Sequence, residues 1–107
     1  MRYDSTVATE ISAYPREGLE RRLIERFVSL RRKHVLEIGC GDGRLTFQIA
    51  PIASSVLAID PDPLSIEEAA GEQQRRGIAN IDFQVGSIER LSAVGAPFDV
   101  ALFSWSL

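Results

Sequence analysis

The sequence predicts an α/β fold in which helices flank a parallel β-sheet. Short apolar runs alternate with segments of helical period, closely spaced glycines follow the first of these runs, and an Asp-Pro pair follows the second. The runs are almost continuously apolar, as expected of strands buried on both faces. Right-handed crossovers are expected to join successive strands. With 107 residues, the chain has room for a single domain.

The first predicted element is an amphipathic helix from Pro15 to Leu30. Leu19, Leu23 and Phe27 recur at four-residue spacing, and Pro15 suits the first turn. Residues 1–35 hold eight Lys or Arg against five acids. Glu and Arg three to four residues apart favour a solvated helix face over an anion-binding patch. Residues 1–34 are therefore interpreted as a helical lead-in to a core at 35–107.

The core is predicted to alternate strands with helices. Each strand candidate is a short apolar run bounded by turn-forming residues. The predicted strands cover residues 35–38, 56–59, 81–85 and 98–103. The predicted helices cover residues 45–52, ending near Pro51, and 64–76, with Gly77 as C-cap, and a short helical or turn segment covers 88–94.

Composition excludes several classes of site and partner. Cys40 and His34 are the only residues of their types, which argues against a disulfide, a zinc site and a Cys/His nucleophile pair, so no metal is expected. No apolar run approaches the roughly 20 residues that span a bilayer, and no secretory signal is apparent, so we expect a cytoplasmic location and no membrane partner. A net charge of −3 gives no indication of nucleic acid.

The glycines after the first strand, at positions 39, 41 and 43, predict a close approach of backbone to a ligand. Their G-x-G-x-G spacing departs from the dinucleotide fingerprint, which needs a small residue where Arg44 stands. No Lys-Ser or Lys-Thr follows, as a P-loop requires. Glu37 precedes the turn by two residues and would repel a pyrophosphate but attract a cation. A positively charged cofactor fits this pattern better than a phosphorylated one.

Asp60 closes the second strand, 21 residues after Gly39. An acid at about this distance accepts hydrogen bonds from the ribose hydroxyls of an adenosine in such folds. The alternative is that Asp60 caps the turn that follows, as Asp before Pro does. Asp62 is interpreted as a turn residue or as the N-cap of the helix that starts at Pro63. Asp60→Ala is expected to abolish cofactor binding and leave the fold intact.

Three runs in order, V-L-E-I-G-C-G-D-G, V-L-A-I-D-P and F-D-V-A-L-F, resemble the class I S-adenosylmethionine-dependent methyltransferases, which have a Rossmann-like fold. The resemblance covers residues 35–107. It implies S-adenosylmethionine as cofactor, with Glu37 near its amino group, Asp60 at its ribose and Pro61 beside its adenine. It also implies a backbone cradle around the methionine part, formed by Gly39, Cys40, Gly41 and Gly43.

The resemblance further implies cofactor contacts after the third and fourth strands. An acidic residue commonly reads the adenine amino group where this chain has Ser87, so adenine recognition would depend more on the backbone of Ile88, with Glu89 as a substitute or a solvated residue. Ser104 is the expected contact after the fourth strand. Trp105 lines a substrate pocket or simply packs there. Cys40 is interpreted as a small residue with backbone duties rather than a nucleophile.

The predicted function is methyl transfer to an unidentified acceptor, with a small molecule favoured and no catalytic residue named. The alternatives are a non-catalytic S-adenosylmethionine-binding fragment and a nicotinamide-dinucleotide-binding Rossmann domain, for which Arg44 is the discriminating residue. Members of the family continue with a further helix and further strands. The single domain of residues 1–107 is thus expected to be truncated after its fourth strand, whose exposed edge would favour association.

Overall fold

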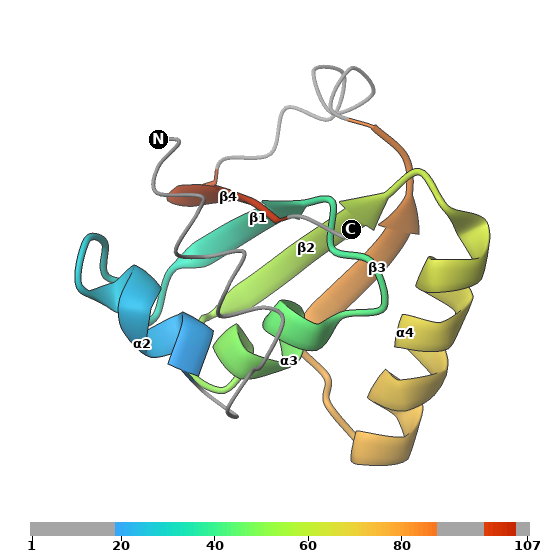
Figure 1. The fold of residues 1–107 in the computed structure, drawn as a ribbon. Coiled ribbons are helices and arrows are strands. Elements are labelled where there is room, and N and C mark those ends of the chain that lie inside the picture. The colour runs from blue at the N-terminus through green and yellow to red at the C-terminus, as the bar shows by residue number, and fades with distance from the viewer. Residues whose placement is uncertain (1–18, 88–97, 105–107) are drawn as a thin grey trace.

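The computed structural model describes residues 19–87 and 98–104, which form a four-stranded parallel sheet with helices against it (Figure 1). The helices are α2 (Leu19–Glu25), α3 (Arg44–Ile49) and α4 (Pro63–Arg76). The strands are β1 (His34–Ile38), β2 (Ser55–Asp60), β3 (Ile81–Val85) and β4 (Val100–Phe103). The predicted α/β class and all four predicted strands are confirmed. The segment 88–94 lies outside the described residues.

The strand order is β3-β2-β1-β4. Strands β2 and β3 are added on one side of β1 and strand β4 on the other, so the order of strand addition reverses between β1 and β4. Residues 34–38 of β1 pair with residues 55–59 of β2, and Val35 to Ile38 pair with Val100 to Phe103 of β4. In open parallel sheets, ligands bind beyond the carboxyl ends of the strands at such a reversal. The order therefore points to the ends of β1, β2 and β4.

The helices in the described residues lie on one face of the sheet (Figure 1). Alternate strand residues such as Val35, Val56 and Ile81 supply that face of the core, and Phe47 and Ile49 of α3 pack against them. Burial of such side chains stabilises the fold by about 1.5–3 kcal/mol each. Among these residues, no helix is long and apolar enough to cross a membrane, and no three His, Cys, Asp or Glu side chains gather in a metal-binding group.

The predicted helix to Leu30 ends earlier than expected, at Glu25. The amides of Arg26 and Phe27 bond to carbonyls three residues back, which tightens the last turn. The chain then leaves the helix, so Phe27 is 89% exposed while Leu30 is fully buried. Placing Phe27 in the apolar stripe was therefore wrong. The predicted start at Pro15 lies outside the described residues.

The ends of α4 confirm the predicted caps. Asp62 is the N-cap, because its side chain accepts a hydrogen bond from the amide of Leu64 at 3.1 Å, and Pro63 occupies the first helical position. Gly77 closes the helix with a left-handed φ of 67°. The Asp62 cap fixes the point at which the chain passes from β2 into α4, and so it fixes the turn that carries Asp60.

Candidate functional site

The carboxyl ends of β1, β2 and β4 meet at one edge of the sheet. The amides of Gly39 and Cys40 donate to the carbonyl of Ile59, at 2.8 and 3.0 Å. The amide of Ser104 donates to the carbonyl of Ile38 at 2.8 Å. The turn after β1 is thus hydrogen-bonded to β2. On its other side, β1 is hydrogen-bonded to the residue that follows β4. We call this region the carboxyl edge.

The glycine turn needs glycine for two separate reasons. Gly39, Gly41 and Gly43 have φ values of 82°, 57° and 94°, in the left-handed region that costs other residues about 1–2 kcal/mol. A Cβ on Gly39 would also lie 2.6 Å from the carbonyl oxygen of Ser104. A Cβ on Gly43 would lie 2.9 Å from the ring of Phe47. The sequence therefore specifies a turn with bare backbone at the carboxyl edge.

Asp60 is 5% exposed, and both of its carboxylate oxygens accept backbone hydrogen bonds. Oδ2 accepts from the amide of Gly41 at 2.8 Å, and Oδ1 accepts from the amide of Asp62 at 2.9 Å. The turn-capping interpretation of Asp60 is therefore confirmed. The expectation that Asp60→Ala leaves the fold intact stays a prediction, and the two amides that would lose their acceptor indicate a cost in stability.

Glu37 lies beneath the glycine turn with no exposed surface. Its Oε1 accepts from the hydroxyl of Thr46 and its Oε2 from the hydroxyl of Ser104, both at 2.5 Å. Burial raises the pKa of the Glu37 carboxyl above its ordinary value of 4.5, and the two hydroxyls act in the opposite direction. The sequence placed Glu37 at the site but did not predict that it would be enclosed.

Cys40 is buried and its Sγ contacts the carbonyl of Gly41 at 3.6 Å. Burial, followed by the nearby carboxylates of Glu37 and Asp60, raises the pKa of the thiol to about 12. Such a thiol stays protonated and is a poor nucleophile. This agrees with its interpretation as a small residue within the turn.

The remaining predicted contacts fall partly on the described residues. Pro61 is exposed directly after Asp60, and Ser87 is half-buried after Gly86, whose amide donates to the carbonyl of Asp60 at 3.1 Å. Ser87 therefore follows a strand end at the same edge. Ser104 is half-buried there too. The other residues predicted here, Ile88, Glu89 and Trp105, lie outside the described residues.

Sequence reasoning missed the contribution of Thr46. This residue lies nine positions after Glu37, on the third residue of α3, and is fully buried. A lone threonine in a helical pattern carries no signal of a carboxylate partner. Only the packing of α3 against β1 brings the two side chains together.

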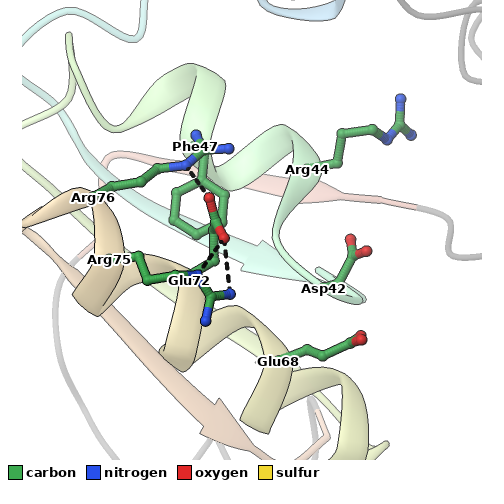
Figure 2. A pocket seen from close by; sticks show the side chains of 7 residues that line it. All are labelled: Asp42, Arg44, Phe47, Glu68, Glu72, Arg75 and Arg76. Carbon is green, nitrogen blue, oxygen red and sulfur yellow. Dashed lines mark hydrogen bonds and ion pairs between the residues drawn. The ribbon is translucent and has the colours of Figure 1, made fainter.

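A groove of about 360 Å³ lies beside the carboxyl edge, between α3 and α4 (Figure 2). Figure 2 shows Glu72 between two arginines, and its carboxylate bonds to Arg75 at 2.9 Å and to Arg76 at 2.7 Å. The guanidinium of Arg76 lies 4.4 Å from the ring centroid of Phe47. The groove contains none of the residues predicted to contact a cofactor; its lining residues are Asp42, Arg44, Phe47, Glu68, Glu72, Arg75 and Arg76.

Arg44 points away from the turn and toward α2. Its Nη1 lies 2.7 Å from the carboxylate of Glu20, which also accepts from Gln48 at 3.0 Å. The helical lead-in is thus bonded to the first residue of α3. No small residue stands at position 44 to bring helix and strand together around a pyrophosphate, so the turn differs from a dinucleotide-binding turn.

Comparisons with known proteins agree with this geometry. Residues 35–107 match the family model described as a methyltransferase domain. The chain is 38% identical over 88 residues to the ubiquinone biosynthesis O-methyltransferase of Methylocella silvestris, covering 80% of this chain and 33% of that protein. It is 35% identical over 105 residues to the aklanonic acid methyltransferase DauC of Streptomyces sp. strain C5, covering 90% of this chain and 48% of that protein.

The fold also matches solved structures. Coclaurine N-methyltransferase, solved with N-methylheliamine and SAH, superposes with a TM-score of 0.62 at 23% identity, over 78% of this chain and 25% of that chain. The present chain spans a third to a half of the length of the two relatives described in the preceding paragraph. The three sequence motifs, the strand order and the family match agree: the chain belongs to the class I, Rossmann-like methyltransferase family.

Proposed function

We propose that this chain is the S-adenosylmethionine-binding part of a methyltransferase. The observation that carries the proposal is the carboxyl edge itself. There the backbone of the glycine turn and two buried acids, Glu37 and Asp60, come from neighbouring strands of the sheet. Each oxygen of these carboxylates accepts one protein hydrogen bond, which leaves acceptor positions that a ligand with donor groups could use. A cationic nucleoside suits this combination of bare backbone and acid.

The residues at the edge fit such a cofactor. Each oxygen of Asp60 accepts one backbone amide, and a carboxylate offers about four acceptor positions in all, so ribose hydroxyls can bond there without displacing the turn. Three apolar residues that lie near Asp60 in the chain or pair with it in the sheet are exposed: Pro61, Leu64 and Val85. Val85 pairs with Asp60 in register. These side chains would pack against the adenine ring, together with Ser87 and Ile88.

The glycine turn and Ser104 complete the proposed site. Gly39, Cys40, Gly41 and Gly43 would cradle the methionine part with their backbone, and Glu37 would bond its amino group. The cofactor supplies a methyl group on a sulfonium, and the residues of this chain bind and orient it. No side chain is assigned as a general base.

The proposed acceptor is a small molecule. Two relatives support this by their names, which refer to ubiquinone biosynthesis and to aklanonic acid. Binding of the cofactor without methyl transfer is the alternative for this chain, which spans a third to a half of those relatives. The cytoplasmic location, the division at residue 34 and association through the edge of β4 stay predictions.

Calorimetric titration of the 107-residue chain with S-adenosylhomocysteine tests the proposal, with NADH as the competing ligand. We expect saturable binding of S-adenosylhomocysteine, lost in Asp60→Asn and kept in Asp99→Asn, whose carboxylate lies at the opposite end of the sheet. Binding of NADH in place of S-adenosylhomocysteine would contradict the proposal and favour the nicotinamide alternative. A methyl-transfer assay then separates transfer from binding alone.

A further inference from the structure

The hydroxyl of Thr46 is a buried polar group that the proposed binding site leaves unexplained. Thr46 lies on the face of α3 that meets the sheet, is fully buried, and donates to Oε1 of Glu37 at 2.5 Å. An enclosed hydroxyl that water cannot reach has only this acceptor, so the hydrogen bond holds Oε1 of Glu37 in one orientation.

The two oxygens of Glu37 have different surroundings. Oε1 faces Thr46 within the core, whereas Oε2 faces the hydroxyl of Ser104, which is half-buried at the end of β4. The Ser104 backbone lies against Gly39, where a Cβ would be 2.6 Å from its carbonyl oxygen. Oε2 is therefore the oxygen directed toward the carboxyl edge.

The two hydroxyls also differ in what they can do. Ser104 lies partly at the surface, so its hydroxyl can exchange Glu37 for water at a small cost in free energy. Thr46 has no exposed surface, so its hydroxyl has no such alternative. An ammonium group carries three donors and bonds a carboxylate more strongly than a neutral hydroxyl does. An incoming cation would thus replace Ser104 and leave Thr46 in place.

We propose that Thr46 is a positioning residue, which fixes Glu37 so that its Oε2 exchanges the Ser104 hydroxyl for the amino group of the bound cofactor. This inference rests on the proposed function and adds to it a residue in α3 and an exchange of hydrogen-bond partners. Thr46 itself never touches the ligand. Its effect must therefore depend on whether the ligand carries an amino group.

Two ligands separate this role from a merely structural one. S-adenosylhomocysteine carries the amino-acid part, whereas 5′-methylthioadenosine lacks it. In calorimetric titrations of the full chain, Thr46→Val is expected to weaken S-adenosylhomocysteine binding roughly tenfold, because Glu37 would no longer be held in place and would have to be ordered when the ligand binds. The affinity for 5′-methylthioadenosine should stay the same. Thr46→Ser keeps the hydroxyl, so it should bind both ligands with the wild-type affinity.

Ser55→Ala serves as the matched control, because it removes a hydroxyl at the opposite end of β2. Ser104→Ala gives a second test, which is independent of how well Thr46→Val folds. It removes the competing hydroxyl, so the affinity for S-adenosylhomocysteine should rise relative to the affinity for 5′-methylthioadenosine, whatever contact Ser104 makes with the part that the two ligands share.

Equal losses for both ligands in Thr46→Val, or no rise in the affinity for S-adenosylhomocysteine relative to 5′-methylthioadenosine in Ser104→Ala, would overturn the positioning role. If the wild-type chain bound neither ligand, the proposed function itself would fail, and the role of Thr46 with it. Binding of both ligands with no discrimination in Thr46→Val would contradict the Thr46 inference alone.

Discussion

The two ends of the sheet bind their strands together with similar polar groups but in different surroundings. At the carboxyl edge, Glu37 and Asp60 are buried, and each of their carboxylate oxygens accepts a hydrogen bond. At the amino edge, the ring Nδ1 of His34 lies 2.7 Å from the hydroxyl of Ser55, and Asp99 accepts from the amide of His34 at 2.8 Å. His34 and Asp99 are exposed there.

The difference shows how burial decides what a polar contact is worth. A buried group that loses its partner costs about 1–3 kcal/mol, whereas an exposed one exchanges its partner for water. The carboxyl edge should therefore respond strongly to substitution and the amino edge weakly. Each of the following predictions changes one residue where this contrast is sharp.

The largest effect is expected from Gly39→Ala. The substitution meets both a left-handed φ of 82° and the carbonyl oxygen of Ser104 at 2.6 Å, so we expect a loss of about 3 kcal/mol in the free energy of unfolding. Gly77→Ala is the matched control, because Gly77 has a φ of 67° but no atom within 4 Å of the new Cβ. Gly77→Ala should lower the free energy of unfolding by about 1 kcal/mol, because only the left-handed backbone conformation opposes the new side chain. Equal losses in urea denaturation would refute the close approach at Gly39.

The next effect is expected from Asp60→Asn, compared with Asp99→Asn. In the wild type, the two carboxylate oxygens of Asp60 accept hydrogen bonds from the backbone N–H groups of Gly41 and Asp62. In Asp60→Asn, one of these oxygens is replaced by an NH₂ group, which cannot accept. We expect a loss of about 2 kcal/mol at Asp60 and less than about 0.5 kcal/mol at Asp99. Urea denaturation of the two variants measures both. Comparable losses at the two ends would show that burial does not separate them.

Glu37→Gln should change how stability depends on pH. Because the pKa of Glu37 is raised in the folded chain, protonation of this carboxyl stabilises the folded chain relative to the unfolded chain. The stability that protonation of Glu37 adds is fully present below its ordinary pKa of 4.5 and is lost as the pH rises through the raised pKa. The wild type should therefore lose stability relative to Glu37→Gln as pH increases above 4.5. A difference that stays constant with pH would indicate an unshifted Glu37.

The smallest effect is expected from Ser55→Ala at the amino edge. Its hydroxyl bonds to an exposed histidine, and water can take its place. The free energy of unfolding should change by less than about 0.5 kcal/mol. A melting temperature several degrees below that of the wild type would mean that the amino edge is more tightly specified than its exposure indicates.

Much of the fold follows from local patterns. The strand at residues 81–85 and the caps Asp62 and Gly77 were predicted as observed, because each depends on a few neighbouring residues. The end of α2 at Glu25 was not predicted, since its apolar period continues through the turn that follows.

The candidate site was predictable only in part. The glycine turn and Asp60 carry signals in their spacing along the chain. The enclosure of Glu37 does not, because its partners lie 9 and 67 residues away and meet it only after α3 and β4 have packed. The dual bonding of Asp60 likewise depends on the fold, through the amide of Gly41, 19 residues away.

The most direct test of the carboxyl edge as the binding site is a crystal structure of the chain with S-adenosylhomocysteine. We predict that the nucleoside lies across the carboxyl ends of β1 and β2, with its ribose hydroxyls bonded to Asp60. A ligand in the groove between α3 and α4, away from Asp60 and the glycine turn, would contradict this assignment.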